Sequence, residues 1–157
     1  MPNVLRNFFQ VYRREFSGSP EATTHFSTQD AESVVWIYPD SEELIKQTAL
    51  EARKIEQPVF RIGRRVSDSV HYPDNSPPDL LIFESAPFTL SRLQCQIEIE
   101  GSKVILRDMG SRLGTRLGGK RLWSNFRESS SLEVPKGEHT LILGHRDGPF
   151  RFRLVVT

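Results

Sequence analysis

The chain has 157 residues, of which 37% are hydrophobic and 26% charged, and its formal net charge is +1. This balance is typical of a soluble globular protein and excludes a chain too polar to form a core. No apolar run reaches the roughly 18 residues that span a bilayer, and no hydrophobic signal segment follows Met1, so we expect a cytoplasmic protein.

The first 33 residues carry few structural signals. The segment from Val4 to Tyr12 allows an amphipathic turn or two. The following Ser17-Gly18-Ser19-Pro20 and the Ser/Thr-rich run from Thr23 to Thr28 are typical of a loop or a linker. We therefore expect residues 1–33 to be flexible or loosely packed.

A strand and a helix are expected in residues 34–56. The stretch from Ser33 to Tyr38 is rich in β-branched and aromatic residues, as strands are. Asp40 then suits the N-cap of a helix, and Glu43 suits the positive end of the helix dipole. Apolar residues recur at three- and four-residue steps, which predicts a helix to about Lys54 with one face packed on the rest of the protein.

From Pro58 onward, short alternating segments separated by turn residues are typical of an antiparallel β-sandwich. The clearest alternation is expected to bury Leu93, Cys95, Ile97 and Ile99 and to expose the residues between them. Gly101-Ser102 predicts a hairpin turn into a strand over residues 103–108. Further strands are expected at 140–144 and 150–156. Residues 65–79 form a long polar loop, a length typical of functional or disordered segments.

Three polar motifs interrupt this strand pattern: Arg61-Ile62-Gly63-Arg64, Ser91-Arg92-Leu93-Gln94 and Asp108-Met109-Gly110-Ser111-Arg112-Leu113-Gly114-Thr115. Basic residues gather around them, and residues 57–157 hold fifteen Lys/Arg against eleven Asp/Glu, whereas residues 1–56 hold six against nine. The guanidinium fork of arginine binds phosphate through charge-assisted, often paired hydrogen bonds. The motifs therefore favour an anionic partner over a merely solvated basic face.

With these motifs, residues 57–157 resemble the forkhead-associated (FHA) domain family, whose signature runs Gly-Arg, then Ser-x-x-His, then Ser-x-Asn-Gly-Thr. The resemblance implies an all-β fold, an antiparallel β-sandwich of Greek-key type, which here follows the strand-helix extension of residues 34–56. It also implies a non-enzymatic module whose loops bind phosphothreonine peptides. Gly63-Arg64 matches the first motif, whereas Gln94 replaces the His and Leu113 replaces the Asn.

The resemblance also implies roles for individual residues. Contacts with the phosphopeptide are expected from Arg64, Ser91, Arg92, Ser111 and Arg112. Gln94 is expected to brace the binding loops from behind, as the family's His does, because an amide also donates and accepts hydrogen bonds. Leu113 has no polar group for the hydrogen bond that the family's Asn makes to the ligand backbone, a loss of about 1 kcal/mol.

The sequence predicts no catalytic residue, cofactor or metal site. The run from Gly114 to Lys120 nearly spells a nucleotide-binding P-loop, but Arg121 occupies the position of the magnesium-binding Ser or Thr. The four histidines lack metal-ligand spacing. Cys95, the single cysteine, occupies an expected core position, so it is interpreted as packing and not as a nucleophile.

Two alternatives to a phosphothreonine-binding module stay open. The departures at Gln94 and Leu113 are compatible with a degenerate FHA fold that mediates phosphate-independent association or dimerisation. Nucleic-acid binding is disfavoured by the near-neutral charge and by the absence of exposed aromatic stacking motifs. We therefore expect a phosphorylated protein as partner, with self-association as an open question, and neither nucleic acid nor membrane.

Overall fold

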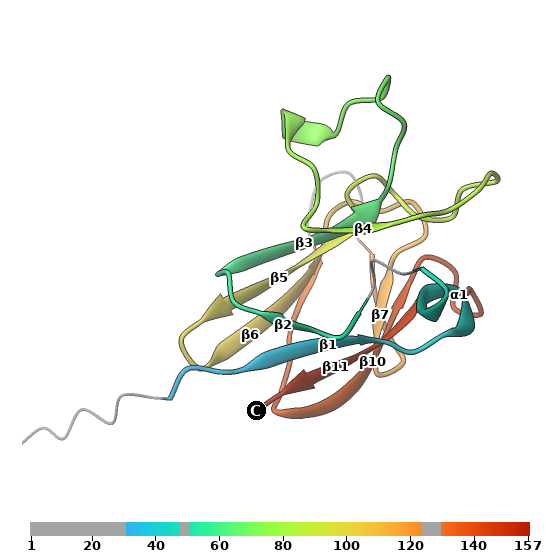
Figure 1. Cartoon of the computed structure of the whole chain (residues 1–157). Helices are drawn as coiled ribbons and strands as arrows, with labels where there is room; N and C mark the ends of the chain where they lie inside the picture. The colour runs from blue at the N-terminus through green and yellow to red at the C-terminus, as the bar shows by residue number, and fades with distance from the viewer. Residues whose placement is uncertain (1–30, 48–50, 124–129) are drawn as a thin grey trace, which may run out of the picture.

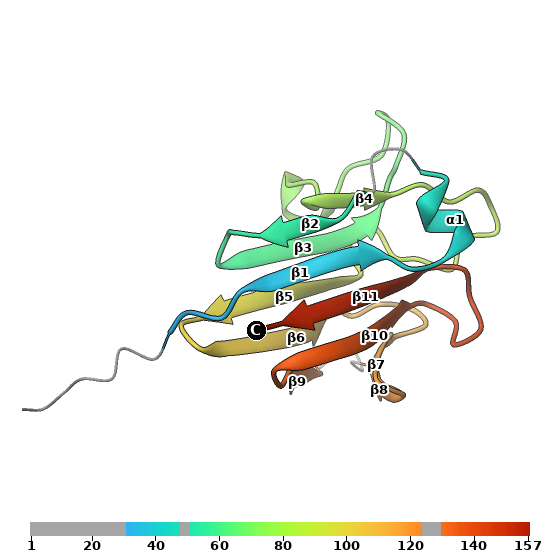
Figure 2. The ribbon, with the colours of Figure 1, turned by 60° about the horizontal axis from the view of Figure 1, so that its bottom comes forward.

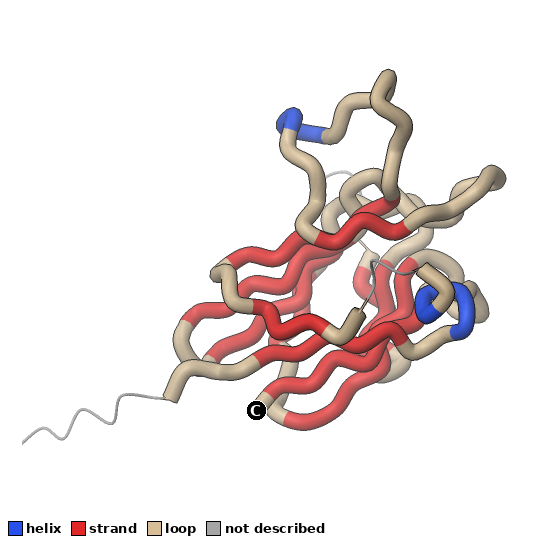
Figure 3. Tube along the Cα trace, in the orientation of Figure 1, coloured by secondary structure: helices blue, strands red, loops and turns tan. Residues whose placement is uncertain are grey.

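The computed structural model describes residues 31–47, 51–123 and 130–157, which form two β-sheets packed face to face (Figure 1). The six-stranded sheet has the order β2 (Arg53–Ile55), β1 (Val35–Pro39), β11 (Arg151–Val156), β10 (Gly137–Leu143), β7 (Thr115–Leu117) and β8 (Lys120–Leu122). The five-stranded sheet has the order β4 (Leu80–Ile82), β3 (Val59–Arg64), β5 (Cys95–Glu100), β6 (Lys103–Asp108) and β9 (Ser131–Glu133). Helical turns are confined to α1 (Glu42–Ile45) and η1 (Pro73–Asn75) in the described residues (Figure 3).

Strand pairing follows the expected antiparallel pattern, with one exception. The described pairs are antiparallel except β3 and β4, which run parallel. In β11, Phe152, Leu154 and Val156 are buried, whereas Arg151 and Arg153 are exposed. Such alternation from both sheets fills a single hydrophobic core. The predicted β-sandwich is therefore confirmed, as are the hairpin turn at Gly101 and the strand over residues 103–108.

The predicted helix is wrong over most of its length. α1 ends at Ile45, and Arg53–Ile55 is strand β2, paired antiparallel with β1. Residues 48–50, also assigned to that helix, lie outside the described residues. The pairing satisfies backbone groups of β1 and buries Ile55, which outweighs a local helical preference of a few tenths of a kcal/mol per residue.

The start of α1 also differs from the expectation. Ser41, not Asp40, is the N-cap residue, and its hydroxyl donates to the carbonyl of Pro149 instead of capping the helix. The carbonyl and carboxylate oxygens of Asp40 accept from Arg151. Leu44 is buried, whereas Ile45 is 65% exposed, so the apolar face of this turn is one residue wide.

Strand β1 lies inside the six-stranded sheet, between β2 and β11 (Figure 2). Val35 pairs with Val156 and Pro39 with Phe152. The first described strand is therefore paired along its whole length with the last. Ser33 is buried, and its backbone N–H donates to the carbonyl of Gly101 over 3.0 Å. The expectation of loose packing in residues 1–33 otherwise falls on residues 1–30, which lie outside the described residues.

The three sequence motifs lie at one end of the sandwich, away from the β5–β6 turn: the first ends strand β3, and the other two lie in or beside the loops that follow β4 and β6 (Figure 1). The loop of residues 65–79 leaves the end of β3 and contains η1, and the loop of residues 83–94 joins β4 to β5. Residues 109–114 join β6 to β7. None of the described helices is long and apolar enough to cross a membrane.

Candidate functional site

Three segments distant in sequence converge at Ser91. The Ser91 carbonyl accepts from the backbone N–H of Arg64 at the end of β3, over 3.0 Å. The Ser91 hydroxyl oxygen accepts from the backbone N–H of Arg112, over 3.1 Å. The end of β3, the β4–β5 loop and the β6–β7 loop are therefore tied together, and the three sequence motifs meet in one place.

A pocket of about 550 Å³ opens between these loops. Its lining contains three arginines and no acidic residue, and comprises Arg64, Pro73, Phe88, Leu90, Ser91, Arg92, Leu93, Met109, Gly110 and Arg112. A concentration of like charge in a concave surface raises the local concentration of oppositely charged ligands. The positive charge and the hydrogen-bond donors of this pocket suit an oxyanion.

Arg64 is held at the wall of this pocket. Its guanidinium carbon lies 3.7 Å from the centre of the Phe88 ring, and its Nε donates to the carbonyl of Leu90 over 3.1 Å. Within the described part of the chain, its two terminal nitrogens make no hydrogen bond. The fork of Arg64 therefore keeps two donor groups for a ligand.

Gly63 is required by the close passage of the β4–β5 loop over β3. A Cβ atom on Gly63 would lie 2.0 Å from the carbonyl oxygen of Arg92 and 2.8 Å from the side chain of Pro78. Any side chain here would displace the loop that carries Ser91 and Arg92. The Gly-Arg pair therefore combines a residue that permits close contact with the loop and a residue that lines the pocket.

Gln94 braces the loops from within the protein. It is fully buried, its Oε1 accepts from the backbone N–H of Ser91 over 3.0 Å, and its Nε2 donates to the carbonyl of Gly114 over 2.8 Å. The predicted strand alternation places Gln94 on the exposed face. This prediction is wrong, because Gln94 lies in the loop before β5, which begins at Cys95. The bracing contacts expected from the resemblance are present.

Ser111 points inward, contrary to the expected phosphopeptide contact. It is 2% exposed and absent from the pocket lining. Its hydroxyl donates to Oδ1 of Asp108 over 2.6 Å and accepts from the backbone N–H of Gly114 over 2.9 Å. Thr115 also donates to Asp108 Oδ1, over 2.8 Å. The buried Asp108 carboxylate thus organises the β6–β7 turn, and Ser111 supports that turn from beneath.

The family model of the FHA domain matches residues 60–133. This part of the chain is an FHA domain. The match covers β3 to β9, which include the three motifs and the loops that line the pocket. No curated protein matches the sequence.

Solved structures share the fold at low sequence identity. The FHA-1 domain of Mycobacterium tuberculosis Rv1747 is 16% identical with a TM-score of 0.52, and the match covers 80% of this chain and 98% of that one. The FHA domain of the Chlamydia trachomatis CT664 protein is 16% identical with a TM-score of 0.50, covering 78% and 96%. Mycobacterium tuberculosis EmbR, solved in complex with a low affinity phosphopeptide, is 17% identical with a TM-score of 0.52; the match covers 79% of this chain but only 24% of EmbR.

Leu113 departs from the FHA signature without disturbing the turn. Its side chain is partly buried and does not line the pocket, and its carbonyl accepts from Arg121 over 3.0 Å. The neighbouring Gly114 has φ of +87°, and a Cβ there would lie 2.8 Å from the carbonyl of Leu122. The turn is therefore kept, although Leu113 offers no side-chain hydrogen-bonding group.

Phe88 and Met109 line the pocket but were not expected from the sequence. Phe88 is 40% exposed in a loop, next to Pro87. An aromatic residue among turn residues is a sequence signal for binding. The sequence alone does not show that the Phe88 ring contacts the guanidinium of Arg64. The role of Met109 has no comparable signal.

Cys95 is a core residue of the FHA domain, as expected. It is fully buried, and burial, reinforced by the negative charge of Asp108, raises the pKa of its thiol. The sulfur therefore stays protonated and poorly nucleophilic. Among the described residues, no group of three or more His, Cys, Asp or Glu is placed to hold a metal ion.

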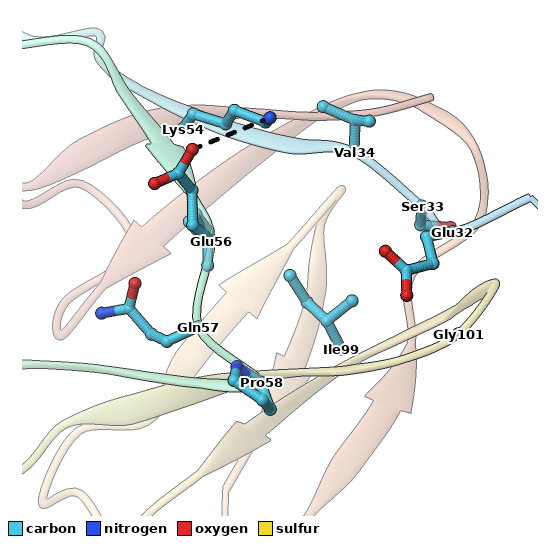
Figure 4. A pocket seen from close by; sticks show the side chains of 10 residues that line it. Glu32, Ser33, Val34, Lys54, Glu56, Gln57, Pro58, Ile99 and Gly101 are labelled. Atoms are coloured by element: carbon cyan, nitrogen blue, oxygen red, sulfur yellow. Dashed lines mark ion pairs between the residues drawn. The ribbon is translucent and has the colours of Figure 1, made fainter.

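A smaller pocket of about 280 Å³ lies where β1 and β2 approach the β5–β6 turn (Figure 4). It mixes both charges with apolar surface, and Lys54 pairs with Glu56 over 3.8 Å. None of the residues of the FHA motifs lines it. Its lining carries both positive and negative residues, whereas the charged residues that line the pocket at Arg64 are all arginines.

The bracing role of Gln94 predicts a loss of stability in the Gln94→Leu variant. The substitution leaves the Ser91 N–H without its partner, which costs about 1–3 kcal/mol, whereas the Gly114 carbonyl still accepts from the backbone N–H of Gly144 over 3.0 Å. We expect the free energy of unfolding to fall by about 1–3 kcal/mol in urea denaturation. Gln96→Leu, at a partly exposed position of β5, is the control and should cost clearly less. Equal losses in the two variants would contradict the brace.

Proposed function

We propose that this chain binds phosphorylated protein partners through phosphothreonine, with its FHA domain as a non-enzymatic interaction module. The supporting observation is the convergence of Arg64, Arg92 and Arg112 on one pocket that contains no acidic residue. The EmbR structure, which shares the fold, contains a phosphopeptide. We place the interaction in the cytoplasm, where a free buried thiol such as Cys95 is usual.

Arg64 is the proposed phosphate anchor. A phosphate group carries about −1.5 to −2 charges near neutral pH and offers three acceptor oxygens. The two terminal nitrogens of Arg64 match two of these oxygens in a paired, charge-assisted contact. The Ser91 hydroxyl accepts from Arg112 and so keeps its own proton for a further phosphate oxygen.

Arg92 and Arg112 supply charge at the rim of the pocket. Both are exposed, and Arg92 is steadied by donation from its Nη1 to the carbonyl of His71 over 2.7 Å. Exposed charges act mainly by attracting the ligand, and salt screens them over about 8–10 Å. Their contribution should therefore fall with ionic strength more steeply than that of the partly buried Arg64.

The preference for threonine over serine is proposed to come from apolar surface in the same pocket. Leu93 and Met109 line it beside Ser91. A methyl group buried against them contributes about 0.8 kcal/mol, or roughly fourfold in affinity. The preference is therefore expected to be modest.

Matched libraries of phosphothreonine, phosphoserine and unphosphorylated peptides test the function, with Leu113→Asn beside the wild-type protein. We expect the wild type to enrich phosphothreonine peptides. Leu113→Asn restores a side-chain partner for the ligand backbone, and about 1 kcal/mol corresponds to a gain of roughly fivefold in affinity. Leu113→Ala is the matched control, because it removes the same side chain without adding a hydrogen-bonding group, and it should show no such gain.

The degenerate FHA fold gives a different result in the same assay. Wild type and Leu113→Asn would then both fail to enrich any phosphopeptide. A protein partner or self-association would persist after phosphatase treatment and in Arg64→Ala. That combination would replace phosphothreonine binding by phosphate-independent association.

A further inference from the structure

Phe88 contacts two of the three arginines of the pocket at once. Its ring lies under the guanidinium of Arg64 at 3.7 Å, and its carbonyl accepts a hydrogen bond from Nη2 of Arg112. Arg64 comes from the end of β3 and Arg112 from the β6–β7 loop, whereas Phe88 belongs to the β4–β5 loop. A single residue therefore links the cations of two other segments.

The contacts restrict Arg64 before any ligand is bound. The ring of Phe88 covers one face of the guanidinium, and the carbonyl of Leu90 takes its Nε. A free arginine side chain carries about 2 kcal/mol of rotamer entropy, which binding must otherwise remove. Groups that are already ordered lose less freedom on binding, so affinity rises without any new ligand contact.

The backbone of the β4–β5 loop is anchored independently of the Phe88 ring. Oε1 of Glu84 accepts from the backbone N–H of Thr89 over 2.7 Å and from its hydroxyl over 2.5 Å. Oε2 of Glu84 accepts from the backbone N–H of Leu90 over 2.9 Å. Phe88 itself is 40% exposed and does not belong to the hydrophobic core. A change of its side chain therefore tests the ring without removing the anchors of the loop.

We propose that Phe88 is a positioning residue that holds Arg64 and Arg112 ready for the phosphate group. The inference rests on the proposed phosphopeptide function and adds how two arginines of the pocket are held in place. The ring acts on Arg64 through a cation–π contact, and the backbone carbonyl acts on Arg112.

The first test compares Phe88→Leu with Phe88→Tyr by titration of the peptide most enriched from a phosphothreonine library. Leucine keeps apolar bulk but has no ring, so affinity should fall about three- to tenfold. Tyrosine keeps the ring and should bind within about twofold of wild type. Thermal melting should not separate the two variants, because the side chain lies outside the core. Equal affinity of the wild type and both variants would overturn the inference.

The second test asks whether Phe88 acts through Arg64. In an Arg64→Ala background, Phe88→Leu should cause no further loss of affinity. A loss as large as in the wild-type background would show that the ring contacts the ligand directly, and would overturn the positioning role. The ligand-free protein gives a spectroscopic check, since a ring 3.7 Å from the guanidinium displaces the NMR resonance of the Arg64 Nε–H. That displacement should vanish in Phe88→Leu and persist in Phe88→Tyr.

The outcomes separate this inference from the proposed function. If the wild type binds no phosphothreonine peptide, the proposed function and the positioning role of Phe88 are both contradicted. If the wild type binds and Phe88→Leu binds equally well, or if the NMR displacement survives in Phe88→Leu, the positioning role alone falls.

Discussion

Arg64→Ala is expected to weaken phosphopeptide binding about ten- to a hundredfold while the fold stays intact. A charge-assisted hydrogen-bonded contact contributes about 1.5–3 kcal/mol, which corresponds to that range. Arg64 is only partly buried, and the variant loses one hydrogen bond to Leu90 and one ring contact within the protein. Isothermal titration with an enriched phosphothreonine peptide measures the affinity, and circular dichroism checks the fold.

Arg153→Ala is the matched control for this experiment. Arg153 also stacks on an aromatic ring, with its guanidinium carbon 4.7 Å from the centre of Tyr38, but it belongs to the six-stranded sheet and lies outside the pocket. Its loss should leave peptide affinity unchanged. An Arg64→Ala protein that keeps both its circular dichroism spectrum and its affinity would exclude Arg64 as the anchor.

Removal of residues 1–56 is expected to abolish cooperative folding. The truncation deletes β1 and β2, and β11 then loses its neighbour along five paired positions. It also removes four buried core side chains, Val35, Ile37, Leu44 and Ile55. Burial of one such side chain contributes about 1.5–3 kcal/mol, so their sum is comparable with the 5–15 kcal/mol of a typical folded domain.

Thermal unfolding followed by circular dichroism measures this effect. A second truncation that removes only residues 1–30 is the control, because it keeps both strands; the difference between the two truncations isolates β1 and β2 with α1. We propose on this basis that residues 34–56 belong to the same folding unit as the FHA domain. A 57–157 fragment that melts at the temperature of the full chain would show the extension to be an independent appendage.

Local patterns predicted most of the sandwich. The alternation of Phe150, Phe152 and Leu154 with Arg151 and Arg153 identifies β11 because a strand turns successive side chains to opposite faces. Gly101 marks the β5–β6 turn because glycine tolerates its φ of +60°. The Gly63-Arg64 pair and the Ser91 motif likewise identified residues that converge in the structure.

The helix prediction failed where a distant partner decided the backbone. Leu44 and Ile45 begin an apolar pattern of helical spacing, yet the chain reverses and forms β2. The hydrogen bonds that β1 offers to residues 53–55 are not visible in the local sequence. Helix propensity is weak enough for such tertiary pairing to override it.

The sequence by itself determined the strand periodicity, the positions of the three motifs and the buried place of Cys95. Only the tertiary structure decided that Gln94 and Ser111 turn inward and that Phe88 meets Arg64. Side chains on a regular strand follow its alternation, so their direction can be inferred from neighbours in the sequence. Side chains in loops point toward whichever donor, acceptor or ring the fold brings near, and those partners come from segments remote in the chain.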